Sequence, residues 1–232
     1  MNSFLLQIPL STDSLGAPVI TEKTLSVIDL ITSGGIGGNL VMGALGLLSI
    51  FAVYILIERF SAIRKASIED DAFLKSIQNF VEAKDIEAAK TLCRNTDSPI
   101  SRMIEKGVNR INKPMTDISA AIENQGKLEV FKMENNLANL ATISGAAPMI
   151  GFLGTVIGMI VAFHEMASAG GNIDVEMLSK GIYTAMTTTV AGLIVGIIAF
   201  IAYNYLVSKV DKVVFMLEAK TTEFLDLLHH NE

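Results

Sequence analysis

The sequence predicts an all-α integral membrane protein with three transmembrane helices, long helices extending into the cytoplasm and a small cytoplasmic helical region. Half of its 232 residues are hydrophobic. Two uncharged runs, 135–163 and 181–208, each exceed the about 20 residues that a membrane-spanning helix needs. A third run, 40–57, lies at the lower limit of that length. Between the first two spans, apolar residues recur at helical spacing.

The N-terminal part is expected to prepare the first membrane crossing. Residues 1–23 are predicted to be a flexible lead-in because proline and glycine are scattered through them. Residues 24–38 are predicted to form an amphipathic helix on the periplasmic surface of the membrane. Gly37 and Gly38 are expected to make a sharp turn at its end, since glycine adopts turn conformations without steric cost. The first transmembrane helix is then predicted at residues 39–57.

Residues 58–134 are predicted to be a cytoplasmic helical region. Asp85 is placed to cap one of its helices, and Ser98 followed by Pro99 is typical of the start of another. No proline interrupts the segment from Lys127 to Ala147. We therefore expect its last helix to run unbroken into the second transmembrane helix.

The remaining segments are predicted as a helical hairpin across the membrane. The second transmembrane helix is placed at residues 135–166, a short periplasmic loop at 167–180 and the third transmembrane helix at 181–208. The cytoplasmic tail, 209–232, is expected to continue the third span as a helix. Its apolar residues keep the helical spacing, at Val210, Val213, Leu217 and Phe224.

Basic residues near the predicted spans set the expected orientation. They follow the first span, precede the second and follow the third, as Arg59, Arg64, Lys65, Lys127, Lys132, Lys209 and Lys212. Because basic flanks favour the cytoplasmic side, the N-terminus is predicted to be periplasmic and the C-terminus cytoplasmic, in a multi-pass protein of the bacterial inner membrane.

Small residues form a stripe along each of the last two spans. Such stripes let two helix backbones approach closely, and the predicted packing residues are Gly151, Gly154, Gly158, Gly192, Gly196 and the kink-forming Pro148. Each stripe contains one threonine, Thr155 or Thr189. Two readings remain open for these hydroxyls, since they could meet a partner across the interface or bond to a carbonyl of their own helix.

Several classes of function lack support in the sequence. It contains neither a GxxxxGK[ST] phosphate-binding loop nor a Cys/His cluster with metal spacing. The net charge of −6 is not gathered into one block, so no nucleic-acid partner is expected. We predict a protein that is not an enzyme and needs no cofactor or metal. None of the three runs has an Asp, Glu, Lys, Arg or His between its ends, so a titrating group for ion transport would have to come from a partner.

Five stretches together resemble the MotA/TolQ/ExbB family of ion-channel motor subunits, and most closely its ExbB/TolQ branch. The resemblance extends from about Val27 to Lys220 and is carried by VIDLITSGG, Ile57-Glu58-Arg59-Phe60, DIEAAKTLCRNTDSP, LATISGAAPMIGFLGTVIGMIVAFHEMA and GIYTAMTTTVAGLIVGIIAFIAYNYL. It implies a proton-driven inner-membrane motor for envelope transport. It further implies a homopentamer around a dimer of an ExbD/TolR-like single-span subunit that carries a membrane aspartate, with a TonB/TolA-like protein as a further partner.

The resemblance places the ion pathway at Thr155 and Thr189. One position departs from the pattern, because Thr184 stands where many members have a glutamate. Thr184 and Thr188 are added to the predicted pathway, since neutral oxygens of this kind also suit a small cation such as sodium. We expect protons because the family uses them most often. The alternatives are a sodium-driven motor or a non-conducting oligomeric scaffold, and the driven process (TonB-type import, Tol function, gliding or secretion) stays open.

Overall fold

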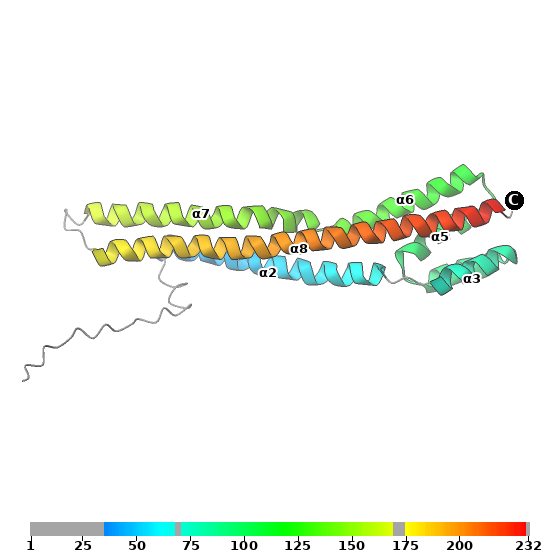
Figure 1. Cartoon of the computed structure of the whole chain (residues 1–232), viewed down its shortest axis with the longest axis horizontal. Coiled ribbons are helices and arrows are strands. Elements are labelled where there is room, and N and C mark those ends of the chain that lie inside the picture. Colours follow the sequence, from blue (N-terminus) through cyan, green and yellow to red (C-terminus); the bar gives the residue numbers. More distant parts are fainter. Residues whose placement is uncertain (1–34, 68–70, 169–174, 231–232) are drawn as a thin grey trace, which may run out of the picture.

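A computed structural model describes residues 35–67, 71–168 and 175–230 of the chain. These residues form an elongated helical rod (Figure 1). Its helices are α2 (Gly35–Ala66), α3 (Asp71–Glu82), α4 (Ile86–Asn95), α5 (Pro99–Val108), α6 (Met115–Glu134), α7 (Leu137–Ser168) and α8 (Val175–His230).

The all-α membrane fold is confirmed. In the described part of the chain, three helical stretches are long and apolar enough to cross a membrane, at Gly37–Ala66, Met115–Ser168 and Leu178–His229. The lead-in at 1–23 and most of the surface helix predicted at 24–38 lie outside the described residues.

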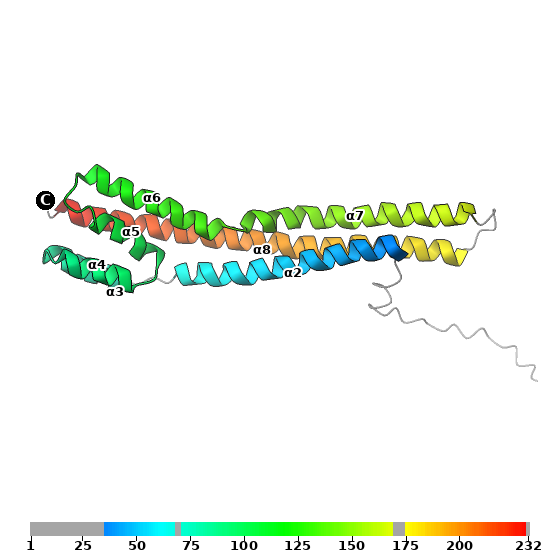
Figure 2. The same cartoon turned by 180° about the vertical axis from the view of Figure 1, so that it is seen from behind.

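The membrane bundle consists of α7, α8 and α2. Helices α7 and α8 run antiparallel side by side, and α2 lies along α8 (Figures 1 and 2). Their outer surface remains apolar, with Ile50, Phe152 and Leu193 exposed. Apolar side chains exposed over a whole bundle are suited to contact with lipid, because lipid tails are as apolar as the interior of a protein and keep these side chains away from water.

At the other end of the rod, α3 to α6 pack around the C-terminal part of α8. Their core contains Ile77, Ile104, Val108 and Ile122, packed with Phe224 of α8 and almost completely buried. Burial of this apolar surface is the main stabilising contribution to a helical cap of this kind. This packing fixes the far end of α8.

Two helix starts in this cap agree with the sequence. The side chain of Asp85 accepts a hydrogen bond from the Ala88 backbone N–H at 3.0 Å. Ser98 forms a reciprocal capping box with Ser101, and Pro99 occupies the first turn of α5. Both caps satisfy N–H groups that a helix leaves unpaired at its start.

The expected unbroken helix from Lys127 to Ala147 is wrong. Helix α6 ends at Glu134, and α7 begins at Leu137. Between them, Asn136 adopts φ 64°, a left-handed conformation that asparagine tolerates better than most residues do. Asn135 and Asn136 therefore separate α7 from α6.

Residues of α2 hold this break in place. Arg59 donates a hydrogen bond from Nη1 to the carbonyl oxygen of Lys132 at 2.8 Å, near the end of α6. Arg59 also pairs with Glu58, whose other carboxylate oxygen lies 3.5 Å from Nδ2 of Asn136. A carbonyl of the last turn has no partner within its helix, so Arg59 supplies the missing donor.

The predicted turn at Gly37 and Gly38 is also absent, because both residues lie inside α2. A side chain there would crowd the neighbouring helices. An added Cβ would lie 3.0 Å from Cγ2 of Ile157 at Gly37, and 3.2 Å from Cγ2 of Thr184 at Gly38. These glycines therefore permit close helix packing instead of a turn.

Candidate functional site

The backbones of α7 and α8 touch along a line that we call the glycine seam, defined by Gly151, Gly154 and Gly158 of α7 and Gly192 and Gly196 of α8. At its centre, a Cβ added to Gly192 would lie 2.5 Å from the Ala147 carbonyl oxygen and 2.9 Å from Cα of Gly151. No ordinary side chain fits at such distances. The seam thus requires glycine at its tightest point.

The seam continues in both directions from this point. An added Cβ at Gly196 would lie 2.6 Å from Cγ of Pro148, and one at Gly158 would lie 3.0 Å from Cβ of Ala185. Pro148 lacks an N–H, so it cannot bond the carbonyl of Ser144 in the preceding turn. This carbonyl faces Gly196, whose added Cβ would lie 3.1 Å away.

The hydroxyls of Thr155 and Thr189 meet across the seam. Their Oγ1 atoms are 2.5 Å apart. The carbonyl oxygen of Gly151 lies 3.0 Å from Oγ1 of Thr189 and 3.4 Å from Oγ1 of Thr155. One hydroxyl can therefore donate to the other while the second donates to the carbonyl, which satisfies both hydrogens.

The other two pathway candidates occupy a different environment. Thr188 is only 1% exposed, and its hydroxyl lies 2.7 Å from the Ala185 carbonyl oxygen of its own helix and 3.3 Å from the Gly151 carbonyl oxygen of α7. Thr184 is 6% exposed and packs beside Gly38 of α2. Thr155 and Thr189 are half-buried. The threonine pair is therefore the more accessible part of the seam, whereas Thr188 is buried within the seam and Thr184 is buried beside α2.

Some threonine hydroxyls also bond to a carbonyl of their own helix, which was the second interpretation left open by the sequence. Thr187 donates to the Tyr183 carbonyl at 2.9 Å, as Thr188 does to Ala185. For Thr155 the own-helix distance, 3.4 Å to Gly151, is longer than its contact with Thr189. Sequence periodicity did not distinguish these cases, because it fixes the face of a helix and not the neighbour that reaches it.

The seam contains contacts that the sequence analysis missed. Gly181 of α8 faces Ala162 of α7. A Cβ added to Gly181 would lie 2.5 Å from the Cβ of Ala162. The carbonyl of Gly151 is the shared acceptor of the threonine pair. The contact of Ala162 with Gly181 could have been predicted, because Ala162 follows Gly158 by four residues and so lies on the same face of the helix. The role of the Gly151 carbonyl could not, because every residue has a backbone carbonyl.

Chemically, this arrangement offers two hydroxyls and one carbonyl, all uncharged. Such groups can relay a proton or support a carboxylate, but they cannot hold a charge themselves. The uncharged runs around them contain no Asp, Glu, Lys, Arg or His. None of these residue types of the same runs can therefore titrate beside the pair.

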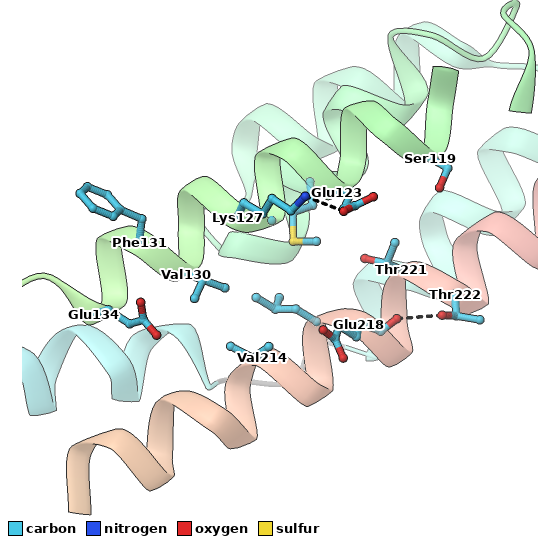
Figure 3. Close-up of a pocket in the computed structure, with 13 residues that line it drawn as sticks. Ser119, Glu123, Lys127, Val130, Phe131, Glu134, Val214, Glu218, Thr221 and Thr222 are labelled. Atoms are coloured by element: carbon cyan, nitrogen blue, oxygen red, sulfur yellow. Dashed lines mark hydrogen bonds and ion pairs between the residues drawn. The ribbon is translucent and has the colours of Figure 1, made fainter. Parts of the chain in front are cut away.

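A large pocket lies elsewhere, between α6 and α8 at the far end of the rod (Figure 3). It has a volume of about 590 Å³. Val130 and Val214 line it, and Glu123 pairs with Lys127 at 2.6 Å on its rim. Because α6 lies beyond the break at Asn136, this pocket is separate from the threonine pair.

Charged groups outside the membrane runs form a second buried cluster, centred on Glu129. This carboxylate is 2% exposed and accepts from Arg102 at 2.8 and 3.1 Å and from Lys132 at 2.9 Å. Burial acts to raise the pKa of Glu129, but the hydrogen bonds from Arg102 and Lys132 outweigh it and hold the pKa below its ordinary value. The cluster joins α5 to α6 and was not predicted from the sequence.

Together these features define a class: a multi-pass, all-α membrane protein whose last two spans meet along a glycine seam with a hydroxyl pair at its edge. The sequence model of the MotA/TolQ/ExbB proton channel family matches residues 95–219, more than half of the chain and the whole seam. The chain belongs to the MotA/TolQ/ExbB proton channel family.

Individual relatives confirm the resemblance to the ExbB/TolQ branch. The chain is 28% identical over 187 residues to the putative biopolymer transport protein ExbB homolog of Methanothermobacter thermautotrophicus. The matched region covers 80% of this chain and 64% of that protein. It is 25% identical over 223 residues to the Tol-Pal system protein TolQ of Pseudomonas aeruginosa, a match that covers 91% of this chain and 96% of that TolQ. A 104-residue match to the putative biopolymer transport protein ExbB-like 2 of Helicobacter pylori is 38% identical and covers 45% and 63%. The match thus spans just under two thirds of the first relative and nearly all of TolQ.

Proposed function

We propose that this chain is the multi-pass subunit of an ion-driven motor in the bacterial inner membrane, which surrounds an ExbD/TolR-like partner and converts ion flow into mechanical work for envelope transport. Family membership and the names of the relatives, biopolymer transport and Tol-Pal system proteins, support this proposal. The observation that carries it is the hydroxyl pair of Thr155 and Thr189 at the edge of the seam.

The partner supplies the titrating group in this proposal. A membrane aspartate of a single-span partner would lie beside Thr155 and Thr189. When ionised, it would draw both hydroxyl hydrogens away from the Thr155–Thr189 and Gly151 contacts, because hydrogen bonds to a charged acceptor are the stronger ones. When a proton neutralises it, the hydroxyls return to each other and the partner helix is free to move.

Repeated steps require several copies of the site. In the proposed assembly, five copies of this chain surround two partner helices, so five sites and two aspartates cannot all be matched at once. Each neutralisation would then favour movement to the next site. A TonB/TolA-like protein would receive the motion, and the N-terminus would be periplasmic with the C-terminus cytoplasmic.

Protons are the proposed ion, because two hydroxyls and a carbonyl suffice for hydrogen-bond exchange with an aspartate. A sodium-driven motor is the second candidate. Thr184 and Thr188 would then contribute oxygens beside the threonine pair, although Thr188 already donates to Ala185. A sodium ion would have to reach both residues although they are buried between the helices.

Ion flux in liposomes tests the proposal. The chain and its partner are reconstituted together, and flux is measured under separate proton and sodium gradients. Thr155→Val and Thr189→Val keep the shape of the side chain and remove the hydroxyl, so each should lower flux about tenfold, the effect of losing one hydrogen bond to a charged group. Replacing the partner's aspartate by asparagine should abolish flux.

Thr187→Val is the matched control, because within the described part of the chain this hydroxyl bonds to Tyr183 of its own helix and to no other residue. Its flux should stay within about twofold of wild type, less than one such hydrogen bond would cause. Wild-type flux in the Thr155→Val/Thr189→Val double variant would reject the threonine mechanism. An assembled wild-type complex without flux under either gradient would favour a non-conducting scaffold.

A further inference from the structure

A second pocket lies between the C-terminal part of α2 and the middle of α8, and no step of the proposed mechanism uses it. Its volume is about 350 Å³. Phe60, Ile63 and Arg64 line it from α2, and Tyr205, Leu206 and Lys209 line it from α8. Ile63 and Leu206 are buried and form its apolar base.

The position of this pocket coincides with the end of the membrane. On α2 the uncharged run ends at Ile57, and on α8 it ends at Ser208. The pocket therefore lies just beyond the run of α2, which Glu58 and Arg59 follow first, and at the end of the run of α8, where Lys209 is the first charged residue. Phe60 and Tyr205 are aromatic, as residues at a membrane interface commonly are.

Arg64 and Lys209, the two cations of the pocket, have no carboxylate partner among the residues that the structure describes. Within the described ranges, neither Arg64 nor Lys209 forms an ion pair, whereas Arg102, Lys127 and Lys132 do. Nζ of Lys209 lies 5.5 Å from the ring centroid of Tyr205. Tyr205 in turn stacks on Phe60 with ring centroids 6.3 Å apart. The aromatic pair thus holds one cation at the mouth of the pocket.

We propose that this pocket binds the headgroup phosphate of an anionic phospholipid. Arg64 and Lys209 would neutralise the phosphate, and the hydroxyl of Ser67, which also lines the pocket, would donate a further hydrogen bond. The acyl chains would continue along the exposed apolar side chains of the same two helices, Ile57 and Ile201. Basic pockets between transmembrane helices on the cytoplasmic side bind anionic headgroups in this way.

Native mass spectrometry of the purified full chain tests this site, because it counts lipids that remain bound in detergent. The probes are dioleoyl phosphatidylglycerol and, as the neutral comparison, dioleoyl phosphatidylcholine. Each cation in direct contact with the headgroup is expected to contribute about fivefold to such affinity, and cations outside the pocket make no such contact. Arg64→Gln/Lys209→Gln should therefore weaken phosphatidylglycerol retention by about 25-fold, while Arg64→Lys should preserve most of it.

Lys65→Gln/Lys212→Gln is the control, because it removes the same charge from neighbouring positions that do not line the pocket. Its retention should change by less than about twofold, below the effect of one pocket cation. Equal loss in both double variants, or equal retention of the two lipids by wild type, would overturn the proposal. Displacement of the lipid by millimolar inorganic phosphate would assign the pocket to free anions instead. Since Arg64 is exposed and Lys209 half-buried, circular dichroism should show unchanged helicity.

Discussion

Single residues of the membrane bundle make two kinds of hydroxyl contact. Thr187 donates to a carbonyl of its own helix, and Thr188 does so at a shorter distance than to the Gly151 carbonyl of α7, whereas Thr155 and Thr189 meet across the seam. An interhelical hydrogen bond in a membrane contributes on average only about 0.6 kcal/mol. A contact of this size can be exchanged for one with a partner's carboxylate at little cost, which suits a site that has to change partners repeatedly.

At the same scale, Glu129 is expected to make stability depend on pH. Its pKa is held below the ordinary 4.5 by Arg102 and Lys132 despite burial. A carboxylate with a lowered folded-state pKa stabilises the fold above its unfolded-state pKa, and this contribution is lost as pH falls through the folded-state value. Glu129→Gln should cost about 1.5 to 3 kcal/mol at pH 7, because it replaces the charged acceptor of the hydrogen bonds from Arg102 and Lys132 by a neutral amide.

Thermal unfolding followed by circular dichroism checks this prediction between pH 7 and pH 3. The difference between wild type and Glu129→Gln should shrink as pH falls below about 4.5, the ordinary pKa of the group, because the unfolded chain then takes up the proton and the stabilisation by the folded-state carboxylate is lost. Glu123→Gln on the same helix removes an exposed pair with Lys127 and should cost less than about 0.5 kcal/mol. A difference that is constant with pH would show that the charge of Glu129 is not the stabilising feature.

At the scale of helices, the seam joins α7 to α8 through backbone contact, and Gly192→Ala should disrupt it. The new Cβ would lie 2.5 Å from the Ala147 carbonyl, so the helices have to separate, at a cost of about 1 to 3 kcal/mol. Unfolding of the purified chain in detergent by titrated sodium dodecyl sulfate measures this loss.

Gly145→Ala on α7 provides the comparison, because nothing lies within 4 Å of its added Cβ. This variant should be neutral or stabilised by up to about 1 kcal/mol, the helix propensity of alanine over glycine. Equal effects of the two substitutions would mean that the close approach at Gly192 does not stabilise the bundle.

The break between α6 and α7 is also a property of helices in contact. Asn136 supplies a residue that tolerates φ 64°, while Arg59 of α2 bonds the Lys132 carbonyl. Either feature alone leaves unpaired carbonyls at the end of α6. The stretch Ile57-Glu58-Arg59-Phe60, by which the family resemblance was partly noticed, therefore has a structural role at this junction.

For the whole molecule, α8 connects the membrane bundle to the helical cap. Its 56 residues correspond to a length of about 84 Å at 1.5 Å per residue. The same helix carries Thr189 at the seam and Phe224 in the core of the cap. Movement at the threonine pair would thus be transmitted along a single continuous helix.

The orientation of the rod in the membrane is tested with introduced thiols. Cys93→Ala removes the chain's one cysteine, whose pKa is raised to about 12 by burial and by the nearby charge of Glu105. In that background, a membrane-impermeant maleimide should label Ser168→Cys in intact spheroplasts. It should label Asp226→Cys only in inverted vesicles, because positive flanks place that end in the cytoplasm. The opposite pattern would reverse the proposed topology.

The sequence by itself determined the helical membrane fold, the glycine stripes and the family, because length, hydropathy and spacing are local properties of the chain. It also indicated the helix starts at Asp85 and Pro99, where capping depends on residues within one turn. The tertiary structure alone decided that Gly38 of α2 packs against Thr184 of α8 instead of forming a turn. It likewise decided that α6 ends before α7 begins. It also decided which threonines meet across the seam and that Glu129 is buried between two cations. These features depend on which helix lies opposite, and residues far apart in sequence set that arrangement through packing that no single segment encodes.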